Sequence, residues 1–147
     1  RDRFVAAHNG HAECLKRLLE NGAKPNQART DDGQTPVSIA IWQGHTECLK
    51  WLLEHGAKQN QELTTAEVTP VFMATEEDHA ECLELLLKHG AESNQALTTN
   101  GATPLYVAAH KGHASVATAL LENGAKPNHA MPNGATPLYA AAQGGPR

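Results

Sequence analysis

The residues of this chain whose types and spacing could do chemistry are three His-x-x-Cys pairs. They are His11 with Cys14, His45 with Cys48, and His79 with Cys82. A His and a Cys three positions apart share one face of a helix, and both side chains are good zinc ligands. The matching position further along the chain is Val116, however, so the slot suits an apolar side chain. Because a free Cys behaves as a small buried hydrophobe, we expect these cysteines to be structural and the chain to hold no metal.

Two pairs of adjacent carboxylates, Asp31-Asp32 and Glu76-Glu77, are the other candidates for chemistry. Paired acids can act as general acid and base only inside a pocket that excludes water. A loop tip and a helix end, where these pairs fall, are solvated. The chain also lacks Gly-x-Ser-x-Gly, a phosphate-binding glycine-rich loop and His-Glu-x-x-His. We therefore predict surface charge rather than catalysis, and a protein that is not an enzyme and uses no cofactor.

Composition narrows the function classes further. Of the 147 residues, 40% are hydrophobic and 4% aromatic, and the net charge of -4 gives no general attraction to nucleic acid or anionic lipid. No apolar run approaches the ~20 residues of a membrane-spanning helix, so we expect no direct membrane insertion. Three cysteines cannot all pair within one chain, which favours an intracellular, cytoplasmic location, with an organelle left open. The chain starts with Arg1 in mid-unit, so we expect it to be a fragment of a longer protein.

The elements that position these residues recur with a fixed period. Its landmarks are glycines spaced 34 apart and Thr-Pro dipeptides in register with them: Gly22, Gly56, Gly90 and Gly124, and Thr35, Thr69, Thr103 and Thr136. A period of this size indicates a solenoid of small stacked units. Each unit buries its apolar face against its neighbours, so there is no single central core.

Each unit predicts two short helices followed by an extended loop. In the second unit, Thr35 suits the N-cap, Pro36 the first helical position, and Gly44 the left-handed end of the helix. The second helix of each unit has an apolar stripe at helical spacing. The predicted helices are residues 4–9 and 12–21, 36–43 and 46–55, 70–77 and 80–89, 104–111 and 114–123, and one helix from residue 137 onward.

The repeated pattern of Gly-x-Thr-Pro-Leu, Ala-Ala, Gly-His, Leu-Leu and Gly-Ala-x-x-Asn resembles the ankyrin repeat. The likeness spans nearly the whole chain and implies an all-α ankyrin-repeat solenoid of four helix pairs and a partial fifth unit. We expect one domain over residues 1–147, with units at about 1–29, 30–63, 64–97, 98–130 and 131–147. The usual period is about 33 residues, so the first three loops carry one extra residue. The Asp that usually opens the loop turn is replaced by Thr30, Thr64, Thr98 and Met131.

The resemblance implies non-catalytic recognition of a partner protein through the concave face, which loop tips and the ends of first helices line. The implied partner-binding residues are Asp31, Asp32, Gln34, Trp42, Gln43, Thr65, Val68, Glu76, Glu77, Asn100, His110 and Lys111, with Ala66, Thr99, Ala102, His8 and Asn9 beside them. Unit three is acidic, which favours a partner with a basic segment and disfavours nucleic acid. The oligomeric state stays open.

Two kinds of substitution within the repeat draw attention. Trp42 fills a slot that other units give to polar residues, so it is a candidate binding hot spot; alternatively it covers a neighbouring loop. Asp78 and Glu67 stand where other units have Gly. A left-handed backbone at either position would cost ~1 kcal/mol or more relative to Gly.

Two other functions fit the same sequence. The chain could be an architectural subunit of a larger assembly, or a regulatory repeat segment of a multi-domain enzyme. Leu138 and Tyr139 lack a second helix to cover them, whereas terminal units normally have a polar outer face. That exposed end favours the architectural function or a longer parent chain.

Overall fold

The computed structural model describes residues 11–59 and 68–144, which form eight α-helices and no strand. The helices are α2 (Ala12–Glu20), α3 (Pro36–Gln43), α4 (Thr46–Glu54), α5 (Pro70–Glu76), α6 (Ala80–Lys88), α7 (Pro104–Lys111), α8 (Ala114–Glu122) and α9 (Pro137–Gln143). The helix predicted over residues 4–9 lies outside the described residues. The all-α solenoid predicted from the sequence is confirmed.

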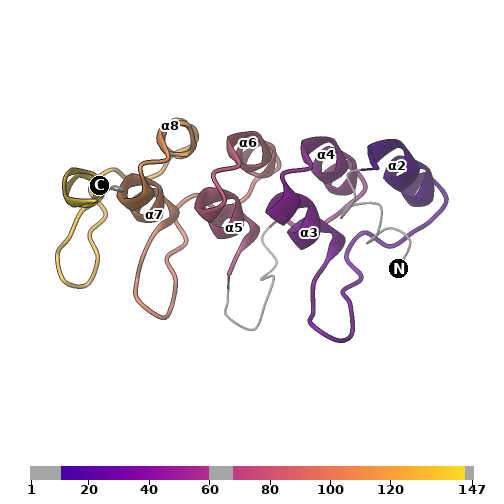
Figure 1. Ribbon diagram of the computed structural model, residues 1–147, viewed down its shortest axis with the longest axis horizontal. Helices are drawn as coiled ribbons and strands as arrows, with labels where there is room; N and C mark the ends of the chain where they lie inside the picture. The colour runs from indigo at the N-terminus through magenta and orange to yellow at the C-terminus, as the bar shows by residue number, and fades with distance from the viewer. Residues whose placement is uncertain (1–10, 60–67, 145–147) are drawn as a thin grey trace.

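The helices lie in two rows along the long axis of the molecule (Figure 1). We call α2, α4, α6 and α8 the outer helices and α3, α5, α7 and α9 the inner helices. Each inner helix packs against the next, α3 on α5, α5 on α7 and α7 on α9. The loops that precede α3, α7 and α9 project to one side, beyond the inner helices (Figure 1). Successive repeats therefore place equivalent residues side by side along the stack.

The inner helices begin as the Thr-Pro dipeptides predict. The side chain of Thr35 accepts a hydrogen bond from the backbone N–H of Ser38, and the Ser38 hydroxyl accepts one from the N–H of Thr35. Thr69, Thr103 and Thr136 accept the equivalent bond from the third residue of their helices. These caps satisfy backbone donors that a helix start leaves unpaired, which fixes the register of every inner helix.

The outer helices end one residue earlier than predicted. His55 and His89 are C-cap residues rather than helical ones. The Nδ1 atom of each ring lies 2.9 Å from a helix carbonyl, that of Trp51 for His55 and that of Leu85 for His89. Each imidazole thus donates to a carbonyl of the last turn, while its own backbone leaves the helix. The helix α5 also ends one residue earlier than predicted, at Glu76, with Glu77 as its C-cap.

The core runs between the two rows and is built mainly of leucine. Leu49, Leu52, Leu83 and Leu86 are each fully buried. Cys48 and Cys82 are buried in the predicted apolar slots, but Cys14 is exposed. Burial in apolar surroundings, with a smaller contribution from Glu47, raises the pKa of the Cys48 thiol to about 11. The buried cysteines are therefore neutral packing groups at physiological pH.

The projecting loops are hairpins closed by main-chain hydrogen bonds. The N–H of Arg29 donates to the carbonyl of Gln34 (2.7 Å), and that of Leu97 donates to Ala102 (2.8 Å). In the last loop Met131 donates to Ala135 (2.7 Å). Met131 thus closes its hairpin, as Arg29 and Leu97 do, and does not take the place of Thr30 and Thr98 inside the tip. The extra residue of the earlier loops lies within the tip, between the two residues that form the closing hydrogen bond. The closing bond is therefore the same in all three loops.

A second set of hydrogen bonds joins neighbouring repeats at the ends of the outer helices. The side chain of Asn26 donates to the carbonyl of Gly56 (3.1 Å) and accepts from the N–H of Lys58 (2.8 Å). Asn94 makes the same pair of bonds to Gly124 (2.9 Å) and Lys126 (2.9 Å). The periodic Asn is thus a link between units, which explains its place in the repeat.

Candidate partner-binding surface

The predicted binding residues of the inner helices lie at the C-terminal ends of α3, α5 and α7. Six exposed side chains form two rows along the stack, and we call them the helix-end rows. The first row is Trp42, Glu76 and His110, and the second is Gln43, Glu77 and Lys111. Because the three helices pack in turn, each row continues from one repeat to the next.

Trp42 is the most exposed large apolar side chain of these rows. It remains 51% exposed, so about half of the residue's surface is in contact with solvent. Its backbone is held from the neighbouring repeat, because Nε2 of His79 donates to the Trp42 carbonyl (3.2 Å). An indole presented on a fixed backbone loses little entropy on binding, which is the property of an interface anchor.

The hairpin tip before α3 is less acidic than its sequence indicates. Nε of Arg29 donates to Asp31 (2.9 Å), its Nη2 contacts the other carboxylate oxygen, and Nε lies 3.7 Å from Asp32. This hydrogen-bonded pair lowers the pKa of Asp31 and raises that of Arg29. Arg29 was not among the predicted residues, although a cation two residues before the carboxylate pair was the available signal. One of the two carboxylates at this tip is therefore paired with a cation of its own hairpin.

Several predicted contact residues build the hairpins. The Oδ1 atom of Asp32 accepts from the N–H of Gln34 (3.0 Å), and Oδ1 of Asn100 accepts from Ala102 (3.0 Å). Asp32 and Asn100 remain exposed, as does Thr99, whereas Gln34 and Val68 are half-buried. Ala102 is only 3% exposed, so its prediction as a surface residue is wrong; it lies on the inward side of the hairpin. The predicted residues Thr65, Ala66, His8 and Asn9 lie outside the described residues, as does Glu67.

His110 is held by a ring contact within its own helix. The imidazole lies parallel to the ring of Tyr106, with an angle of 4° between the planes and 6.3 Å between the centroids. Tyr106 is half-buried and His110 exposed. The contact orients the His110 ring without removing the side chain from solvent.

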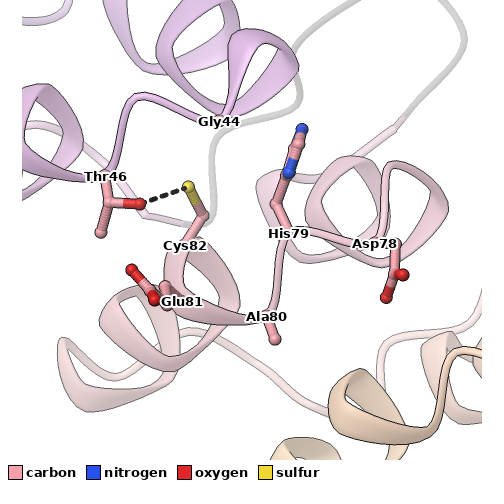
Figure 2. A pocket seen from close by; sticks show the side chains of 7 residues that line it. All are labelled: Gly44, Thr46, Asp78, His79, Ala80, Glu81 and Cys82. Carbon is pink, nitrogen blue, oxygen red and sulfur yellow. Dashed lines mark hydrogen bonds between the residues drawn. The ribbon is translucent and has the colours of Figure 1, made fainter.

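A hollow of about 340 Å³ opens between the corners of units two and three (Figure 2). Its lining residues are Gly44, Thr46, Asp78, His79, Ala80, Glu81 and Cys82. The Thr46 hydroxyl lies 3.8 Å from the sulfur of Cys82, and the Asp78 carboxylate points away from the hollow (Figure 2). Burial, the largest cause, raises the pKa of the Cys82 thiol. Among residues 11–59 and 68–144, no three potential metal ligands cluster.

Asp78 adopts the left-handed backbone that its place in the repeat predicts, with φ of 58°. A Cβ on Gly44 would lie 2.9 Å from the ring of His79, and Asp78 has such a Cβ at the equivalent corner. The next histidine, His113, accordingly lies differently. Its Nδ1 donates to the carbonyl of Thr75 (3.0 Å) and lies 3.9 Å from Asp78 Oδ1. One Gly-to-Asp difference therefore changes how two repeats join.

The C-terminal end of the stack exposes apolar side chains that are buried in the other units. Leu121 is 46% exposed, whereas its counterparts Leu53 and Leu87 are 6% and 8% exposed. Leu138 is 78% and Tyr139 56% exposed. The expectation that nothing covers these two side chains is confirmed for the described residues. We call these three residues the end face.

Comparison with protein families gives a match along almost the whole chain. A family model described as ankyrin repeats (3 copies) matches residues 4–63, 58–131 and 91–147. Comparison with curated proteins gives no match. In the part of the chain that the structure describes, no helix has both the length and the apolar character needed to cross a membrane.

Proposed function

The chain belongs to the ankyrin-repeat family, and from that premise we propose that it is a non-catalytic module that binds a partner protein through its helix-end rows and hairpin tips. Ankyrin repeats are in general protein–protein interaction modules, and the family is typically non-catalytic. The observation that supports this surface is Trp42, an indole half in solvent at a slot where the stack accepts polar residues. We place the module in the cytoplasm.

The proposed mechanism is presentation of side chains on a rigid support. The Thr caps fix where each inner helix begins, and His79 holds the backbone at Trp42. The hairpin tips are tied by their own main-chain and Asx bonds. Binding to a surface of this kind orders few groups, so little of the interaction free energy is lost.

The test uses the purified chain as bait and the partner proteins that it captures. Each captured partner is then titrated against the Trp42→Ala and Glu76→Lys variants. We expect Trp42→Ala to weaken binding by about 30-fold or more, as truncation of a hot-spot residue does. Glu122→Lys, an exposed change on the outer helix α8, is the matched control and should leave affinity within about twofold. Unchanged affinity in both surface variants would disprove binding through the helix-end rows.

The end face favours a second candidate function, that of an architectural subunit. Leu121, Leu138 and Tyr139 are exposed apolar side chains that a stacked neighbour would cover. Leu138→Ser with Tyr139→Ser makes the two most exposed side chains of the end face polar without touching the helix-end rows. If this double variant abolishes assembly with a captured partner, while Trp42→Ala does not, the architectural function replaces the recognition function.

A further inference from the structure

The helix-end rows change their chemistry in a fixed order along the stack. In the first row an indole at Trp42 is followed by a carboxylate at Glu76 and an imidazole at His110. In the second row the order is an amide, a carboxylate and an ammonium, from Gln43, Glu77 and Lys111. Both rows thus change together from uncharged, at α3, to acidic, at α5, and at α7 the second row carries a cation beside the imidazole of the first.

Glu76, Glu77 and Lys111 form no ion pair inside the described part of the molecule. The ion pairs there involve Arg17, Arg29 and His113, and none includes Glu76, Glu77 or Lys111 within 4.0 Å. The three side chains are exposed at helix ends, where they can reorient towards a bound chain. The rows can therefore offer their charges to a ligand rather than to each other.

The distance between successive inner helices determines which residues of a bound peptide can contact equivalent positions. Packed helices lie about 8–10 Å apart, so α3, α5 and α7 repeat at about that distance. An extended peptide in the polyproline II conformation advances about 3.1 Å per residue with three residues per turn, so about three of its residues span one repeat. Every third side chain of such a ligand lies on the same face, and would thus meet the same position in successive repeats.

We propose that the helix-end rows bind a segment of a partner protein in the polyproline II conformation, with the pattern apolar-x-x-basic-x-x-acidic in either chain direction. The proposal rests on the proposed function, and it names the partner's sequence class. The apolar side chain packs on Trp42, and the Lys or Arg pairs with Glu76 and Glu77. The Asp or Glu pairs with Lys111 and accepts a hydrogen bond from the His110 ring. A uniformly basic segment would bring a cation against Lys111, and a nucleic acid would bring phosphates against the glutamates.

The experiment measures binding of three fluorescent 12-residue peptides to the full chain by anisotropy. One has the proposed pattern, one has its two charges exchanged, and one has Lys at both charged positions. We expect the proposed pattern to bind about tenfold or more tightly than the exchanged peptide, with the all-basic peptide between them. Equal affinities, or tighter binding of either other peptide, would overturn the proposal.

A charge exchange in the protein provides the complementary test. Glu76→Lys, Glu77→Lys and Lys111→Glu together should reverse the ranking, so that the exchanged peptide binds best. The control variant makes the same charge changes at exposed residues away from the rows, with Glu20→Lys, Glu54→Lys and Lys126→Glu, and should keep the original ranking. Thermal melts of both variants verify that they fold. If the peptides rank in the same order of affinity in the charge-exchange variant and the control variant, the helix-end rows do not distinguish the order of charges in a ligand.

The outcomes separate this proposal from the proposed function. If a captured partner depends on Trp42 but no peptide ranks as expected, the surface binds proteins and the sequence pattern is wrong. If no partner depends on Trp42 or Glu76 and the peptides do not discriminate, both proposals fail.

Discussion

The imidazole of His79 lies directly against Gly44 of the preceding repeat, and a Cβ there would come 2.9 Å from the ring atom Cε1. This contact lets Nε2 of His79 reach the carbonyl of Trp42. The corner glycine is thus needed twice, once for its backbone conformation, with φ of 71°, and once for the space it leaves.

The free energy of unfolding of two Gly→Ala variants should separate the backbone effect from the loss of space at His79. Gly44→Ala combines a strained left-handed backbone with overlap on His79, and we expect a loss of about 2–4 kcal/mol. Gly112 has nearly the same φ, 72°, and nothing within 4 Å of its Cβ position, so Gly112→Ala should cost only the backbone term of about 1–2 kcal/mol. Urea unfolding followed by circular dichroism gives both values. Equal losses in the two variants would show that the His79 contact has no energetic weight.

The titration of Asp31 should report its pairing with Arg29. The hydrogen bond from Arg29 lowers the pKa of Asp31 in the folded chain. A lowered pKa favours the folded state at pH above the unfolded pKa, near 3.9, and that contribution disappears as pH falls through the folded pKa. We expect NMR of the side-chain carboxyl to show a pKa below the ordinary value. In Arg29→Gln the Asp31 pKa should return towards that value, and an unchanged pKa in this variant would contradict the pairing.

Thiol reactivity should divide the three cysteines. Cys14 is exposed, whereas Cys48 and Cys82 are buried and burial raises the pKa of both thiols. At pH 8 a disulfide reagent such as DTNB should therefore label Cys14 fast and the other two only as the chain opens. Labelling in urea, where all three react, is the control. If the Cys14→Ser variant still reacts fast in native buffer, Cys48 or Cys82 is accessible, and the core between the inner and outer helices is not closed.

Local signals in the sequence were sufficient for the architecture. Thr35 and Pro36 fix the start of α3 through a backbone cap, and Gly44 fixes its end, so the prediction of residues 36–43 is confirmed to the residue. The outer helices were predicted one residue too long because His55 is compatible with a helix in sequence terms. Only the structure shows its ring bonded to Trp51 while its backbone departs.

The surface was harder to predict because it depends on contacts between residues that no period specifies. Periodicity cannot tell which side of a hairpin faces inward, and so Ala102 was placed at the surface although it is buried. Nor does it show that Arg29 turns back on Asp31. The two histidines His79 and His113 are equivalent in the repeat, yet they bond different carbonyls because one corner has a Gly and the other an Asp.

The hairpins have a further consequence for how such a chain can diversify. Tips of different length are closed by the same main-chain bonds, from Arg29, Leu97 and Met131, and each keeps an Asx bond just before its closing partner. The closing bonds use backbone atoms only, so they place few demands on the residues between them. The residues of one tip should therefore be able to replace those of another. Such a graft should change which partner the chain binds and leave the structure of the helix stack unchanged.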